Sequence, residues 1–161
     1  MPYACFHEYF PEIAERETRT ITILEQSSSE LPPGEYSFIE MYCNERKCDC
    51  RRVFFYVVSP SNKKPLAVVA YGWESRKFYA KWMKDNSPKV TAELQGPVLN
   101  RCSPQSSLAP AILQIVKDII LQDKVYVERI KTHYAMFRDR IDRKLRLKRT
   151  RRGKIKKKRK K

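Results

Sequence analysis

Hydrophobic and polar residues follow the short period of β-strands in the first half of the chain. Ile21 and Ile23 alternate with threonines, which is typical of a strand with one buried face. The run VFFYVV is almost continuously β-branched or aromatic, which indicates a central strand buried on both faces. The predicted strands are Thr18–Leu24, Tyr36–Cys43, Arg51–Val58 and Leu66–Tyr71. Because the last three are joined by short connections, they should form an antiparallel meander that the first strand can extend.

The periodicity becomes helical after Gly72. Phe78 and Trp82 are one helical turn apart, and the isoleucines and valine that follow residue 110 recur at spacings of three and one. Further on, apolar residues recur every three or four positions as far as Leu145, in a helix that Asp123 can cap. The predicted helices are 74–85, 88–96, Pro110–Leu121 and a long one after Asp123, with a short helix at His7–Arg16.

These elements predict an α+β fold. We expect an antiparallel sheet of three or four strands, with the C-terminal helices packed on one face. Residues 1–137 should form the domain that holds the cysteines, and residues 138–161 a basic helical extension that ends in a disordered tail. The tail is low in complexity and repels itself, so it should be helical only where its charges are neutralised.

Charge is concentrated in that tail. The chain has a formal net charge of +16, and residues 138–161 hold 16 lysines or arginines and two aspartates. The body is therefore close to neutral, and its tail should bind polyphosphate tightly, in a salt-sensitive manner and with little sequence preference. The predicted nucleic-acid-binding residues are Arg143, Lys144, Arg146, Lys148, Arg149, Arg151, Arg152, Lys154, Lys156, Lys157, Lys158 and Arg159.

RNA is the favoured partner, because a long basic extension can thread irregular folded RNA. The ribosome, which contains such RNA, is a possible partner. DNA remains an alternative, as does a tail that only aids solubility or localisation. Attraction to anionic lipid is disfavoured, because the tail lacks the aromatic and leucine face of helices that lie on membranes.

Three of the five cysteines, Cys43, Cys48 and Cys50, lie within eight residues between two predicted strands. Zinc prefers thiolate and imidazole ligands, so this spacing predicts a structural zinc site. We expect His7 to be the fourth ligand, and the other candidates are Cys5, Cys102 and His133. Free thiols in a mobile loop, or a redox or nucleophilic site, are the alternatives. The flanking arginines and a lysine should lower the pKa of the thiols.

Little else in the sequence indicates catalysis. The chain has two histidines and four glycines, so no phosphate-binding glycine loop can be identified. The aromatic residues near the third predicted strand could stack on bases, but such groups are more often part of the core. They are Tyr71, Trp73, Phe78, Tyr79 and Trp82. No leader peptide or apolar run of membrane-spanning length is apparent, which favours a cytoplasmic protein. Nothing in the pattern specifies an oligomeric state.

Several blocks of the sequence resemble an uncharacterised bacterial protein family. They include YC-x4-CDCRRV at positions 42–53 and YGWES at positions 71–75, and the similarity covers roughly residues 6–137. In that family a module of this kind often precedes a SecA-C-terminal-like (SEC-C) zinc motif. The resemblance implies a bacterial protein with a cysteine metal site and no known activity. This chain departs from the pattern because the basic tail stands where the second cysteine cluster would be.

The leading hypothesis is a non-enzymatic, zinc-stabilised accessory protein that binds RNA through its tail. The competing hypotheses are a thiol- or metal-dependent enzyme centred on the three clustered cysteines, and a protein–protein adaptor whose tail recruits acidic partners.

Overall fold

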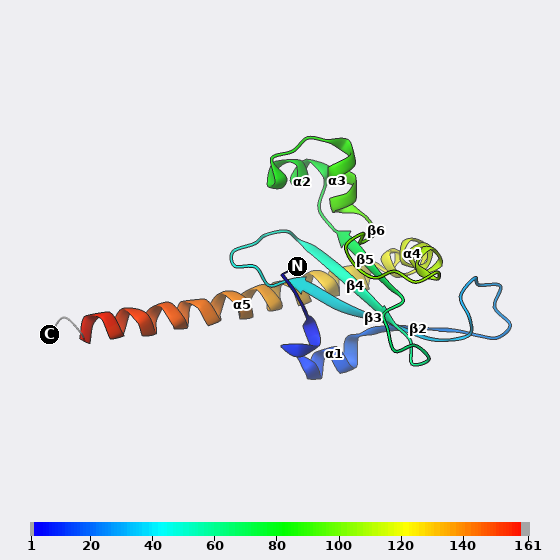
Figure 1. The fold of residues 1–161 in the computed structure, drawn as a ribbon, viewed down its shortest axis with the longest axis horizontal. Coiled ribbons are helices and arrows are strands. Elements are labelled where there is room, and N and C mark those ends of the chain that lie inside the picture. Colours follow the sequence, from blue (N-terminus) through cyan, green and yellow to red (C-terminus); the bar gives the residue numbers. More distant parts are fainter. Residues whose placement is uncertain (1, 159–161) are drawn as a thin grey trace.

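The computed structural model describes the backbone of residues 2–158 and the side chains of residues 2–143. It confirms the predicted α+β class: an antiparallel six-stranded sheet carries helices, and one long helix crosses it and leaves the body (Figure 1). The strands are β1 (Tyr3–Cys5), β2 (Arg19–Ile23), β3 (Gly34–Cys43), β4 (Arg52–Val58), β5 (Ala67–Gly72) and β6 (Val98–Leu99).

The four predicted strands correspond to β2, β3, β4 and β5, and the last three form the expected meander. Two further strands were not predicted. The first, β1, has three residues and the last, β6, has two, so neither is long enough to establish a period in the sequence. The ten-residue strand β3 organises the sheet, because it pairs with β4 along one edge and with both β1 and β2 along the other.

Five α-helices and two short 3-10 helices complete the described fold. They are η1 (Phe6–Glu8), α1 (Pro11–Glu17), α2 (Arg76–Met83), α3 (Pro88–Gln95), α4 (Ala109–Asp118), η2 (Ile120–Gln122) and α5 (Lys124–Lys158). Asp123 caps α5 as predicted, since its carboxylate accepts a hydrogen bond from the Tyr126 backbone N–H at 3.1 Å. Ser87 precedes α3 but makes no side-chain capping bond.

The main core lies between one face of the sheet and helices α4 and α5. Phe38 and Phe55 point from the sheet into this core, and Ile112 of α4 and Ile130 of α5 face them, all at most 1% exposed. A smaller buried cluster around Phe54 lies on the opposite face. The predicted placement of the C-terminal helices on one face of the sheet is therefore confirmed.

The body extends further along α5 than the predicted domain boundary after Phe137. Arg138 is 9% exposed and Ile141 packs against the core. Beyond them α5 continues without a break to Lys158 and points away from the sheet (Figure 1). Of the predicted nucleic-acid-binding residues, Arg143 is exposed, and the side chains from Lys144 onward, with Arg159, lie outside the described residues.

In the part of the chain that the structure describes, none of the helices combines the length and the apolar character needed to cross a membrane.

Candidate functional site

The three clustered cysteines meet at one end of the sheet. Cys43 is the last residue of β3, and Cys48 and Cys50 lie in the loop that leads to β4. Their sulfur atoms are all within 4.8 Å of one another. Cys43 and Cys50 are 3% and 2% exposed, while Cys48 is half-buried. The sequence prediction that this spacing brings three thiols together is confirmed.

The cysteine loop, residues 43–51, is held against α5 by two side chains of that helix. The Arg138 guanidinium donates hydrogen bonds to the backbone oxygens of Cys43 at 2.7 Å and Glu45 at 2.9 Å. The Tyr134 hydroxyl accepts a hydrogen bond from the Arg51 backbone N–H at 3.2 Å. Lys47 and Arg51 both adopt left-handed backbone conformations, with φ of 56° and 48°. Because such residues cost free energy, the loop depends on the contacts that surround it.

The three thiols differ in acidity. A hydrogen bond from Cys50 lowers the pKa of Cys43 to about 6, against the effect of burial, and the charge of Arg138 also contributes. Burial raises the pKa of Cys48, and the interaction with Cys43 together with burial raises that of Cys50. The lowered pKa of Cys43 thus comes from Cys50 and from Arg138 of α5, while the pKa values of Cys48 and Cys50 are raised, so the expectation that the flanking cations favour the thiolate form is not met.

The guanidinium groups next to the cysteines have other partners. Arg51 forms salt bridges with Asp49 at 2.9 Å and Glu74 at 3.0 Å. Arg52 donates a hydrogen bond to the Leu94 backbone oxygen at 2.9 Å, at the end of α3. Sequence proximity did not reveal where these side chains point.

His7 belongs to a different group from the three cysteines. It lies with Cys5 and Glu8. The Cys5 sulfur, one ring nitrogen of His7 and one carboxylate oxygen of Glu8 are all within 4.8 Å of one another. In the antiparallel pairing of β1 with β3, Tyr3 is opposite Cys43 and Cys5 is opposite Met41. The chain therefore moves away from the cysteine loop before it reaches His7, and the structure does not bring this predicted ligand to the cluster.

The other candidate fourth ligands also lie elsewhere. Cys102 is exposed in the loop after β6, and His133 is 2% exposed and held by two carboxylates. Among the side chains that the structure describes, no fourth histidine, cysteine, aspartate or glutamate has a ligand atom within 4.8 Å of all three sulfurs. The cluster therefore offers three of the four ligands of a structural zinc site, and its all-thiol donor set fits zinc.

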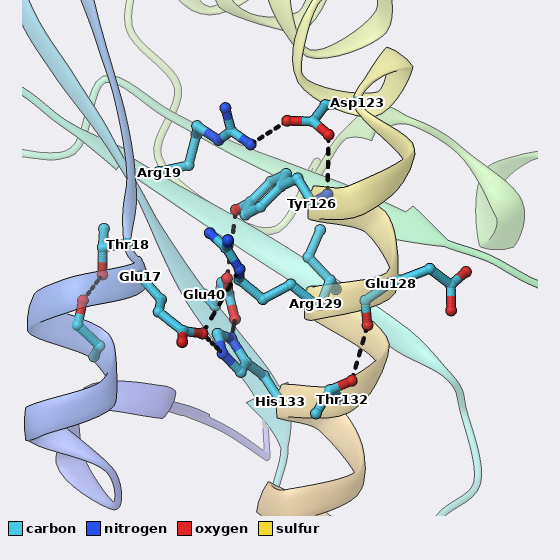
Figure 2. Close-up of polar contacts among 12 residues, drawn as sticks. Glu17, Thr18, Arg19, Glu40, Asp123, Tyr126, Glu128, Arg129, Thr132 and His133 are labelled. Atoms are coloured by element: carbon cyan, nitrogen blue, oxygen red, sulfur yellow. Dashed lines mark hydrogen bonds and ion pairs between the residues drawn. The ribbon is translucent and has the colours of Figure 1, made fainter.

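A second constellation is buried between α1, β3 and α5 (Figure 2). The His133 imidazole lies between two carboxylates, with Nδ1 2.7 Å from Glu40 Oε2 and Nε2 2.7 Å from Glu17 Oε2. The Tyr42 hydroxyl donates a hydrogen bond to Glu40 Oε2 at 2.6 Å. The Phe6 ring stacks on the imidazole with a centroid distance of 4.3 Å. We call Glu17, Glu40 and His133 the buried triad; Glu40 and His133 are buried, and Glu17, with 35% of its side chain exposed, closes the group at its outer side.

The buried triad shifts the protonation of its histidine. Burial alone would lower the pKa of His133, but hydrogen bonds and charges from Glu40 and then Glu17 outweigh it, and the pKa is raised. The charged imidazolium can donate from both ring nitrogens, one to each carboxylate. The triad therefore joins three elements that are far apart in sequence with one ionised group.

The sequence analysis gave Glu40 no role and missed the triad. The signal was present: Glu40 lies between Phe38 and Tyr42 on the face of β3 that points into the core. An acid in such a position requires a buried partner. The sequence offers two histidines as neutralising groups of that kind, but it does not reveal which one β3 meets.

The triad predicts that stability depends on pH. Because the pKa of His133 is raised in the folded state, its stabilising contribution is complete below the ordinary histidine pKa and is lost as pH rises through the raised value. We expect the urea midpoint of the wild-type protein to exceed that of H133Q most at about pH 6 and less at pH 8. A difference between the two proteins that does not change with pH would contradict this assignment.

The aromatic residues near β5 separate into buried and exposed members. Tyr79 is fully buried, and Trp73 is half-buried with its ring 5.1 Å from that of Tyr134. Phe78 is half-buried under the Arg51 guanidinium, while Trp82 is 36% exposed. The interpretation of these aromatic residues as part of the core is therefore correct for Tyr79 and wrong for Trp82.

Comparison with known proteins adds no relative. No family model matches the chain, no curated protein matches its sequence, and no solved structure matches its fold. The resemblance to the bacterial family therefore stays a prediction.

Proposed function

We propose that the protein is a non-enzymatic accessory protein that binds RNA through the cationic part of α5. The observation that carries this proposal is the course of α5 itself. The helix is anchored in the core by buried residues such as Ile130 and Phe137, and it then leaves the body in one piece (Figure 1). The sequence contains no acidic residue after Asp142, and residues 143–161 hold 14 lysines or arginines.

This arrangement supports binding of a polyanion at a distance from the body. The helical residues 143–158 span about 24 Å at a rise of 1.5 Å per residue. In the sequence, 11 of these 16 residues are lysine or arginine, which suits contact with phosphates without a fixed register. Affinity should therefore come from the release of counterions and depend little on sequence. RNA is favoured over DNA, and ribosomal RNA is the RNA that we would test first.

In this proposal the cysteine loop stabilises the body with a structural zinc ion. Burial of Cys43 and Cys50 favours a structural role over a reactive thiol, because reactive cysteines are usually accessible. Cys43, Cys48 and Cys50 would hold the ion, which would join the end of β3 to the start of β4. A cytoplasmic location is part of the same proposal.

The salt dependence of binding tests the role of the tail. We expect the full-length variant K154Q/K156Q/K157Q/K158Q, here the tail-neutral variant, to bind structured RNA more than tenfold more weakly. If all four lysines contact phosphates, the slope of log K against log salt should fall by about 3 to 4, at about 0.7 per contact for single strands and about 0.9 for a duplex. Fluorescence anisotropy of a labelled RNA between 50 and 300 mM salt would measure both quantities.

A variant with the same change of charge provides the control. K63Q/K64Q/K89Q/K117Q also removes four exposed lysines, but from the body. It should keep most of the wild-type slope, and an equal loss in the two variants would mean that only net charge matters. Unchanged binding by the tail-neutral variant would overturn the proposal. Recovery of the full-length protein from its own cell lysate would then show whether RNA, DNA or an acidic protein accompanies it.

A further inference from the structure

Three side chains that bind metals meet where β1 passes into η1. The Cys5 sulfur, a ring nitrogen of His7 and a carboxylate oxygen of Glu8 are mutually within 4.8 Å. We call these three residues the N-terminal group. They come from four consecutive positions in the chain, so a shared ligand would close only a very short loop and would cost little chain entropy.

The backbone of the turn brings these side chains together. Cys5 ends β1 and is the N-cap residue of η1. In a 3-10 turn, side chains three residues apart eclipse one another, and Cys5 and Glu8 have this spacing. The Glu8 carboxylate does interact with the Cys5 thiol: after burial, its charge and its hydrogen bond are the causes that raise the pKa of Cys5. His7 belongs to the same turn.

The N-terminal group is built on a firmly packed part of the fold. Cys5 is paired with Met41 across β1 and β3. Phe6 is 2% exposed, and its ring lies 5.0 Å from that of Phe10 and 4.3 Å from that of His133. The Phe6 backbone oxygen accepts a hydrogen bond from the Phe10 backbone N–H at 3.0 Å. Because packing fixes the backbone around the three ligands, the site is largely formed before a metal binds.

The N-terminal group is more accessible than the cysteine loop. Cys5 is half-buried and both His7 and Glu8 are exposed, whereas Cys43 and Cys50 are almost completely buried. Closed structural zinc sites use four protein ligands, while three ligands leave a coordination position for water. An ion in the N-terminal group should therefore exchange with the solution and be lost during purification in metal-free buffer.

The donor set indicates which ion would bind. A thiolate, an imidazole and a carboxylate are all zinc ligands, with bonds of about 2.0 to 2.3 Å. Tetrahedral bonds of that length place the ligand atoms about 3.5 Å apart, which the observed 4.8 Å limit accommodates. Calcium and magnesium prefer oxygen ligands alone. One thiolate and one carboxylate also balance the charge of a divalent cation.

We propose that Cys5, His7 and Glu8 bind a divalent transition-metal ion, zinc by preference, in a second, exchangeable site that is separate from the cysteine loop. Water would complete the coordination on the exposed side. A bound ion would also hold η1 in place, where Phe6 stacks on the imidazole of the buried triad. The inference goes beyond RNA binding by α5 and does not depend on it.

The experiment titrates the reduced full-length protein with cobalt(II) chloride, because a cobalt–thiolate bond gives an absorption band that zinc lacks. We expect C5S to bind one equivalent fewer than the wild type and to lack the corresponding band. H7A and E8Q should weaken this binding by about 10- to 100-fold, since removal of a ligand costs at least as much as removal of an outer-shell partner. C102S and E12Q change an exposed thiol and an exposed carboxylate outside the group and should bind like the wild type.

The zinc content of the same purified variants separates the two sites. If C5S loses one cobalt equivalent and keeps the zinc found in the wild type, the second site stands. If C5S binds as much cobalt as the wild type, or if E12Q is as weak as E8Q, the second site is overturned. If C5S also loses the purified zinc, Cys5 belongs to the site of the cysteine loop, which overturns a separate site as well. None of these results depends on affinity for RNA, which the tail-neutral variant tests.

Discussion

Replacement of His133 by alanine is expected to lower the free energy of unfolding by about 3–5 kcal/mol, the usual cost of removing one partner from a buried ion pair. The substitution leaves Glu40, whose side chain is 4% exposed, without its positive partner. The Tyr42 hydroxyl would still donate to that carboxylate, but it carries no charge to balance it. Urea unfolding followed by circular dichroism at pH 6 measures the change.

The double variant E40Q/H133A tests whether charge or packing is responsible. If the uncompensated carboxylate causes the loss, the neutral amide should restore part of the stability of H133A. If the cavity left by the imidazole and its contact with Phe6 are responsible, the double variant should be no more stable than H133A. R143A provides a surface control: it breaks an exposed salt bridge to Asp139 and should change stability by less than about 1 kcal/mol.

Purified full-length protein is expected to contain one zinc ion per chain and to lose it in C50S. Three thiolates within 4.8 Å form most of a structural site, and serine is a much weaker zinc ligand. At a free zinc concentration one hundred times the Kd, binding adds about 2.7 kcal/mol to stability, which a chelator should remove. Mass spectrometry of the metal content and thermal unfolding with and without chelator would measure the two effects.

Two matched substitutions test candidates for the remaining ligand. C102S alters an exposed thiol outside both groups and should keep the zinc. H7A should also keep it, because His7 lies with Cys5 and Glu8. Loss of zinc in H7A would restore the ligand assignment that the sequence suggested. Protein that holds no metal, or that keeps it in C50S, would contradict the proposed zinc site.

The sequence was most informative for features that depend on a few neighbouring residues, such as a strand with alternating hydrophobic positions or the cysteines of one loop. Four strands could be predicted because alternation and β-branched runs depend on neighbouring residues, and β3 to β5 pair through short connections. The three-thiol cluster followed from eight residues of local sequence. The two-residue strand β6 and the three-residue strand β1 have no such signal, because the pairing partner defines them.

Long-range side-chain geometry was not predictable in the same way. Glu40 and His133 are 93 residues apart, and neither residue type reveals its partner. The flanking arginines were expected to act on the thiols, but acidic side chains and backbone oxygens hold them elsewhere. The position of His7 depended on the direction in which β1 runs along β3, which only the register of pairing specifies.

The contact of α5 with β3 also has a consequence for biosynthesis. The meander β3–β4–β5 can pair early, because its turns are short and its contacts are local in sequence. Helix α4 can cover only part of its apolar face, and the rest stays open until Tyr126, Ile130 and Phe137 are available. Until those residues have been translated, part of the apolar face of the sheet is exposed in the nascent chain. Exposed apolar surface of this kind promotes aggregation and is bound by chaperones. The sheet should therefore close only after α5 has been made, when this helix packs over strands that were made before it.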